Sequence, residues 1–122
     1  MGEYRILFLG DIVGKPGRIA VQRHLDTLQN EHQPLFTIVN GENAAAGVGI
    51  TPDIAEELFK LGIDVITLGN HAFHKREIFD YLSKGRPIVR PANLPPTTPG
   101  LGWVAVEREG IRLAVTNLCG RV

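Results

Sequence analysis

The sequence contains a single cysteine, Cys119, among its 122 residues. One cysteine cannot form an internal disulfide or a cysteine-rich zinc cluster, so its scarcity indicates a reducing compartment and metal ligands of other kinds. No apolar run approaches the roughly 20 residues that a membrane-spanning helix needs. The first residues, Met-Gly-Glu-Tyr-Arg, also lack the basic flank and apolar region of a secretory signal. We therefore expect a cytoplasmic protein with no membrane partner.

The chain has no net charge either, because 13 Lys and Arg residues balance 13 Asp and Glu residues. Without a strong overall field, nucleic acid is not expected as a stable partner, and any bound anion must be held by local groups. The apolar content of 43% and the charged content of 21% are typical of a globular chain that buries a core. At this length we predict a single domain over residues 1–122.

Short apolar runs alternate with segments of helical periodicity. Residues 4–9, 35–39 and 63–68 are nearly continuous apolar runs, which are typical of strands buried on both faces. A first helix is predicted over residues 17–31, from the spacing of Ile19, Ala20, Val21, Leu25 and Leu28. A second helix is predicted between the cap Thr51-Pro52-Asp53 and Gly62, with Ile54, Leu58 and Leu61 as its apolar stripe.

A third helix is predicted over residues 75–83, with Ile78, Phe79 and Leu82 facing inward, and a short strand over 88–89. Residues 103–107 and 111–118 flank Arg108-Glu109-Gly110 and predict an antiparallel hairpin closed by a glycine turn. The fold class predicted is therefore α/β, with a mainly parallel sheet flanked by helices and a C-terminal β-hairpin. Ligands of such sheets bind beyond the carboxyl ends of the strands.

Polar residues follow the three predicted strands at these carboxyl ends, each next to a glycine: Asp11, then Glu42 and Asn43, then Asn70 and His71. The segment Gly10–Lys15 is not a P-loop, because three residues instead of four separate its glycines and Pro16 replaces the required Ser or Thr. It also lacks the second glycine of the dinucleotide fingerprint. Neither nucleotide motif therefore explains the polar cluster.

Two carboxylates that meet without a basic partner repel each other unless a cation lies between them. A dinuclear metal site would resolve this repulsion, with Glu42 as the bridge, Asp11 and Asn43 on one ion and Asn70 on the other. Singly, Asp11 and Asn70 are more often helix caps or turn formers, and His71 is more often an ordinary histidine. Their convergence on three successive strand ends favours a functional site.

Other polar residues give weaker signals. His24 and His32 have no partner pattern and are expected to be solvated, as are Lys15, Arg18 and Arg76, although these cations lie where a phosphate could use them. His74 is ambiguous between a cap for the third helix and an edge of the pocket. No residue is singled out for substrate binding.

Five motifs together resemble one family: GDIVGKPGR (10–18), NGENAA (40–45), GNH (69–71), KREI (75–78) and RPAN (90–93). They resemble the YmdB-like bacterial phosphodiesterase branch of the calcineurin-like metallophosphoesterase superfamily, over essentially the whole chain. Val13 and Glu42 depart from the wider superfamily in the manner of this branch. His74 stands where many members of the branch have aspartate.

The resemblance implies half of an α/β/β/α sandwich and a hydrolase with two transition metal ions. Iron is the metal it favours, with manganese as the alternative. Asp11, Glu42 and Asn43 would hold one ion, and Glu42 and Asn70 the other. His71 would donate a proton to the leaving oxygen of a small phosphodiester such as a cyclic nucleotide of the cAMP type.

Members of this branch are roughly twice as long and take further histidine ligands from their second half. We therefore expect a chain truncated at its C-terminal end that is weakly active or inactive alone. The alternative class is a non-catalytic α/β nucleotide- or phosphate-binding regulatory module. A homo-oligomer is compatible with either class.

Overall fold

A computed structural model describes residues 2–121 and contains a parallel sheet, three helices and a hairpin within that range. The elements are β1 (Ile6–Asp11), α1 (Gly14–His32), β2 (Phe36–Asn40), α2 (Pro52–Lys60), β3 (Val65–Thr67), α3 (Ile78–Leu82), β4 (Ile88–Val89), β5 (Trp103–Arg108) and β6 (Ile111–Thr116). The first four strands pair in parallel in the order β1-β2-β3-β4, and β5 and β6 form an antiparallel hairpin. The predicted α/β class with a C-terminal hairpin is confirmed.

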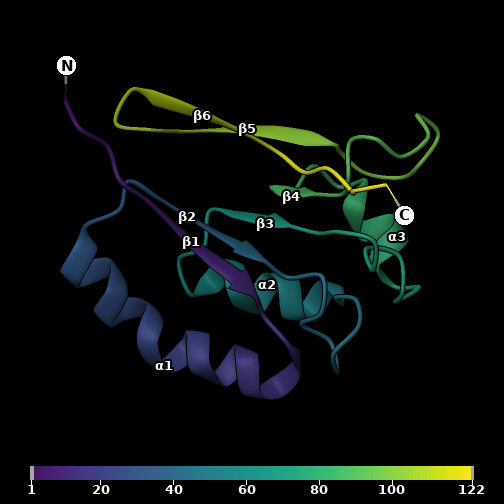
Figure 1. The fold of residues 1–122 in the computed structure, drawn as a ribbon, viewed down its shortest axis with the longest axis horizontal. Helices are drawn as coiled ribbons and strands as arrows, with labels where there is room; N and C mark the ends of the chain where they lie inside the picture. The colour runs from purple at the N-terminus through teal and green to yellow at the C-terminus, as the bar shows by residue number, and fades with distance from the viewer. Residues whose placement is uncertain (1, 122) are drawn as a thin grey trace.

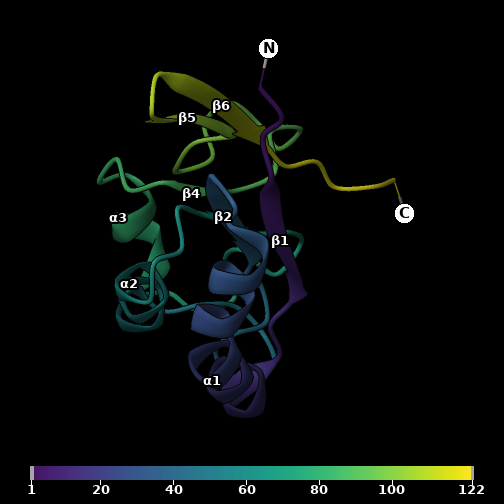
Figure 2. The same ribbon diagram turned by 90° about the vertical axis from the view of Figure 1, so that its left-hand side faces the viewer.

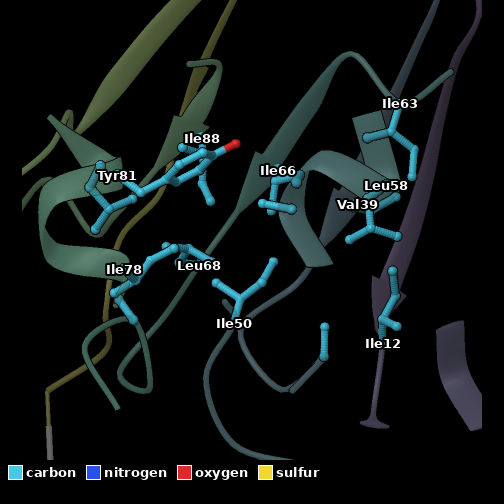
Figure 3. Close-up of a cluster of buried hydrophobic side chains, with 14 of the residues drawn as sticks. Ile12, Val39, Ile50, Leu58, Ile63, Ile66, Leu68, Ile78, Tyr81 and Ile88 are labelled. Atoms are coloured by element: carbon cyan, nitrogen blue, oxygen red, sulfur yellow. The ribbon is translucent and has the colours of Figure 1, made fainter. Parts of the chain in front are cut away.

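The sheet lies between two layers, with α1 and α2 on one face and the hairpin on the other (Figure 1, Figure 2). On the helix face, Val39, Ile66 and Leu68 pack with Leu58 of α2 (Figure 3). Leu25 of α1 belongs to the same cluster. On the opposite face, a second cluster joins residues of the sheet to the hairpin; it contains Ile38, Val65, Val89 and Val115, with Val104, Val106 and Leu113 against them. Burial on both faces explains the continuous apolar runs of β2 and β3.

The prediction that β1 is buried on both faces is wrong. Ile6 and Phe8 are 49% and 56% exposed, whereas Leu7 and Leu9 pack against the helix-face core. The strand lies at the edge of the sheet, and the apolar cluster beneath the hairpin draws its sheet residues from β2, β3 and β4. One face of β1 is therefore left open to solvent among the described residues.

The helices differ from their predicted bounds for identifiable reasons. Helix α1 begins at Gly14 instead of residue 17, because Pro16 lies in its first turn, where the missing N–H costs nothing. Ala20 is exposed on this helix, outside the buried stripe. In α3 the inward aromatic residue is Tyr81, which is 6% exposed, while the predicted Phe79 is 39% exposed. Within residues 2–121, no helix has both the length and the apolar character to cross a membrane.

The predicted ends of α2 and the predicted hairpin turn are confirmed. Thr51 caps α2 by accepting a hydrogen bond from the backbone N–H of Ile54 at 3.3 Å, and Gly62 follows the helix with a φ of +102°. The hairpin turn contains Glu109 and Gly110 with φ of +52° and +76°, as a two-residue turn with the twist of its strands requires. The turn connects Arg108 directly to Ile111, so β5 and β6 pair in register over their full length.

Candidate functional site

The carboxyl ends of the first three strands align at one edge of the sheet. Asp11 at the end of β1 pairs with Asn40 at the end of β2, and Asn40 pairs with Thr67 at the end of β3. Because these strands are parallel, the loops that follow them start side by side. This register brings the polar residues after β2 and β3 close to Asp11.

A continuous series of hydrogen bonds links Asp11, Asn43 and His71. The side-chain amide of Asn43 donates to both carboxylate oxygens of Asp11, at 3.0 and 3.1 Å, and its oxygen lies 2.5 Å from Nδ1 of His71. Because the carboxylate can only accept, Nδ2 of Asn43 must face Asp11, and its Oδ1 must face the imidazole. Nδ1 of His71 therefore carries a proton, and Nε2 is its free nitrogen when the ring is neutral.

Glu42 lies beside this series with a largely buried side chain, 18% exposed. One carboxylate oxygen accepts a hydrogen bond from Asn40 Nδ2 at 3.4 Å. The other accepts from the backbone N–H of His71 at 3.4 Å and lies 3.8 Å from His71 Nδ1. The loops after β2 and β3 thus fix the glutamate and the histidine against each other.

Asn40 is a site residue that the sequence analysis missed. Its side chain donates to Glu42 Oε1, and its Oδ1 accepts from the backbone N–H of Glu42 at 3.2 Å. The available signal was an asparagine at the last position of a mostly apolar strand, two residues before the glutamate. Asn40 holds the Glu42 carboxylate in place from the end of β2.

Asn70 and His74 lie at the margin of this arrangement. Asn70 is exposed and borders the same open cavity as Glu42. The ring of His74 packs edge-on against His71, with centroids 5.3 Å apart. Neither residue caps a helix, since the cap of α3 is Glu77, and Asp11 is not a cap either, since the cap of α1 is Val13. The capping explanations for Asp11, Asn70 and His74 are therefore wrong.

Lys15 and Arg18, two of the cations that the sequence analysis noted, form no ion pair with the carboxylates of the site among the described residues. Lys15 and Arg18 border a separate groove between α1 and α2. Arg18 donates to the backbone oxygen of Ala44 at 2.6 Å and lies 4.0 Å from Glu57. Within residues 2–121, neither Asp11 nor Glu42 pairs with a lysine or arginine.

The donor set suits a cation only in part. Two carboxylates without a lysine or arginine partner, together with asparagine oxygens, are ligands that hard and borderline metal ions accept. Within the described range, however, no three His, Cys, Asp or Glu side chains come together as a metal would require. These residues could therefore supply only part of a coordination sphere.

The fold and the site place the chain among α/β proteins that bind their ligand at the carboxyl edge of a parallel sheet. Comparison with known families gives a more specific result: residues 7–122 match the YmdB-like protein family. The chain belongs to this family, as the motif resemblance predicted.

Two curated relatives agree with this assignment. A 2',3'-cyclic-nucleotide 2'-phosphodiesterase of Bacillus subtilis is 50% identical over 96% of this chain and 44% of its own length. A putative phosphatase/phosphodiesterase of Mycoplasma genitalium is 32% identical over 98% of this chain and 44% of its own length. The chain therefore spans less than half the length of these relatives.

Two crystal structures share the fold. A hypothetical protein from Thermus thermophilus superposes with a TM-score of 0.88 at 39% identity, over 96% of this chain and 45% of that one. A phosphatase from Mycoplasma pneumoniae superposes with a TM-score of 0.89 at 34% identity, over 98% of this chain and 44% of that one.

Proposed function

We propose that the whole protein is a metal-dependent phosphodiesterase that hydrolyses cyclic nucleotides. The observation that supports this most is the hydrogen-bonded series Asp11–Asn43–His71 with Glu42 beside it, at the edge of the sheet. The names of the relatives support phosphoester hydrolysis, and the Bacillus subtilis relative makes 2',3'-cyclic nucleotides the first substrates to test. A 3',5'-cyclic nucleotide such as cAMP is the second.

Asp11, Glu42, Asn43 and Asn70 would hold two transition metal ions. Iron is the first metal to test and manganese the second. Two ions held by these oxygens would provide hydroxide at neutral pH and neutralise charge on the phosphoryl group. Asn40 and the backbone N–H of His71 each donate a hydrogen bond to one carboxylate oxygen of Glu42, which orients this carboxylate for the shared position. The described residues would supply only part of the ligand set, and other parts of the whole protein would supply the remaining ligands.

His71 would act as the proton donor. Hydrolysis forms a bond from the hydroxide oxygen to phosphorus and breaks the bond from phosphorus to the leaving oxygen, which needs a proton. A protonated His71 has a hydrogen on both nitrogens. It can therefore give up the Nε2 proton while Nδ1 stays bonded to Asn43, which orients the ring.

The test uses the whole gene product, loaded with manganese or iron and assayed on 2',3'-cyclic AMP, cAMP and bis-p-nitrophenyl phosphate. Glu42→Gln keeps the shape of the side chain but removes its charge, so we expect hydrolysis and metal content to fall together. Glu31→Gln, an exposed residue of α1, is the matched control. If the Glu42 variant retained activity, the proposed role of Glu42 as the bridging ligand would be wrong.

A second variant separates the histidine from the metal ligands. His71→Ala should lower turnover by about 10²- to 10⁴-fold, the usual contribution of a general acid, while metal content stays normal. Loss of metal together with activity would instead make His71 a ligand.

The non-catalytic nucleotide- or phosphate-binding module is the alternative. A purified whole protein that binds a nucleotide, contains no transition metal and hydrolyses none of the three substrates would establish this alternative in place of the enzyme.

A further inference from the structure

The turn between β3 and α3 brings two histidine rings together. His71 and His74 lie three residues apart, and the backbone N–H of His74 donates to the backbone oxygen of His71 at 3.2 Å. The residues between them are anchored in the core: Ala72 is 1% exposed, and Phe73 packs against Phe79 of α3 with ring centroids 5.2 Å apart. Both histidines therefore project from a turn whose backbone is fixed.

The rings of His71 and His74 meet at right angles. Their centroids are 5.3 Å apart and their planes make an angle of 88°, which is the edge-to-face geometry that aromatic pairs favour. Asn43 already holds the His71 ring at Nδ1. A single hydrogen bond leaves the plane of the ring free to tilt, because the last torsion of a histidine side chain has broad preferences. Contact with the ring of His74 restricts this tilt and so fixes the direction of Nε2.

The loop after β2 also packs close to His74. A Cβ placed on Gly49 of this loop would lie 3.0 Å from the Cβ of His74, so no side chain fits between them. Gly49 is itself held by the loop: its backbone N–H donates to the oxygen of Glu42, and its oxygen accepts from the N–H of Ala45 at 2.8 Å. The loop that carries the Glu42 carboxylate therefore also fixes the position of His74.

We propose that His74 is a positioning residue that orients the imidazole of His71 for proton donation, an inference that rests on the proposed phosphodiesterase function. In that reaction a hydroxide oxygen forms the bond to phosphorus, and the bond from phosphorus to a ribose oxygen breaks. The ribose oxygen takes the Nε2 proton of His71. Because proton transfer depends on the distance and angle of the donor, a ring that tilts away from the leaving oxygen loses rate.

The choice of leaving group separates the positioning of a proton donor from a general loss of structure. The ribose oxygen of 2',3'-cyclic AMP needs a proton to leave, whereas p-nitrophenolate is a stable anion that leaves without one. In the metal-loaded whole protein, His74→Ala should lower the ratio of kcat for 2',3'-cyclic AMP to kcat for bis-p-nitrophenyl phosphate by roughly two- to tenfold. KM for both substrates and the metal content should stay at the wild-type level.

Three further variants sharpen the test, and since His74 is exposed they should all fold. His74→Phe keeps an aromatic ring and should retain most of the wild-type ratio, whereas His74→Asn keeps hydrogen-bonding groups without a ring and should behave as His74→Ala does. His32→Ala, at an exposed histidine of α1, is the matched control and should leave the ratio unchanged.

A double variant tests whether His74 acts through His71. His71→Ala alone should lower the same ratio, because it removes the proton donor. Adding His74→Ala to His71→Ala should then cause no further loss, since the group that His74 orients is already absent.

Four outcomes would overturn the positioning role: an unchanged ratio in His74→Ala, wild-type behaviour of His74→Asn with loss in His74→Phe, a further loss in the double variant, or loss of metal from His74→Ala. A wild-type protein that hydrolyses neither substrate, or a fully active His71→Ala variant, is a failure of the proposed function and is distinct from these outcomes.

Discussion

The carboxylate of Glu42 fills the space that a side chain at Gly69 would occupy. A Cβ placed on Gly69 would overlap both carboxylate oxygens of Glu42. The glycines beside the other strand ends differ: a Cβ at Gly41 would meet Ile66 and Ile50, and a Cβ at Gly10 would meet nothing within 4 Å. The close approach of the Glu42 carboxylate therefore explains why position 69 is a glycine. It does not explain the glycine at position 10.

Gly69→Ala is expected to displace the Glu42 carboxylate while leaving the fold in place, because φ at this position is not positive. If Glu42 bridges two ions, a displacement of about 1 Å should lower kcat/KM by about a hundredfold. Gly10→Ala is the matched control and should keep full activity and metal content. Equal activity of the two variants would contradict the importance of the Glu42 position.

The bond between Asn43 and His71 predicts one tautomer of the histidine. In its neutral form the ring should be protonated at Nδ1, which nitrogen chemical shifts in NMR spectra measure directly. Asn43→Ala removes the acceptor, so the ring should then populate both tautomers. Nε2 protonation of neutral His71 in the metal-free wild type would contradict the hydrogen-bonded series, and this readout does not depend on activity.

Much of the fold could be predicted from local pattern, and the errors have a common physical origin. The apolar run in β1 resembles those of β2 and β3, but burial of Ile6 and Phe8 depends on what covers the second face of the sheet. Similarly, Phe79 and Tyr81 are both apolar enough to face inward from a short helix. The bond between the Tyr81 hydroxyl and Glu56 of α2 favours the tyrosine. These outcomes depend on contacts between elements and not on periodicity.

The site could be predicted where it follows strand order. Asp11, Glu42, Asn43 and His71 meet because parallel strands end together, which the sequence pattern already implies. The segment after β6 borders the same cavity as Glu42, and this was not foreseen, because its place depends on bonds between Asn93 and Cys119, 26 residues apart in the chain. No short motif encodes a contact of that range.

Tyr81 should make stability sensitive to alkaline pH. Burial, together with the hydrogen bond to Glu56, raises the pKa of the Tyr81 hydroxyl to about 12. Above pH 10 the unfolded chain loses this proton while the folded chain retains it, so the free energy of unfolding should fall as pH rises from about 10 to 12.

Tyr81→Phe tests this effect by urea unfolding at several pH values. The variant should be about 1 kcal/mol less stable at pH 7, because Glu56 loses a hydrogen bond. Its stability should then decline less than that of the wild type between pH 10 and 12. Tyr4→Phe, at an exposed tyrosine, is the control and should follow the wild-type curve. Parallel curves for wild type and Tyr81→Phe would contradict the raised pKa.

Asp64 and Arg108 connect the hairpin to the sheet through an ion pair. Substitutions of these two residues should lower the free energy of unfolding by different amounts. Arg108 of β5 pairs with both oxygens of Asp64, at 2.7 and 3.2 Å, but its side chain is 50% exposed. Asp64 is 13% exposed and also accepts the backbone N–H of the buried Thr37 at 2.7 Å.

Asp64→Ala leaves the Thr37 N–H without its partner and should cost about 1–3 kcal/mol in urea unfolding. Arg108→Met loses an ion pair that is half in solvent and should cost about 1 kcal/mol or less. Arg112→Met, at an exposed pair with Glu107, is the control with almost no effect. A larger cost for Arg108→Met than for Asp64→Ala would contradict the weight given to the bond between Asp64 and the Thr37 N–H.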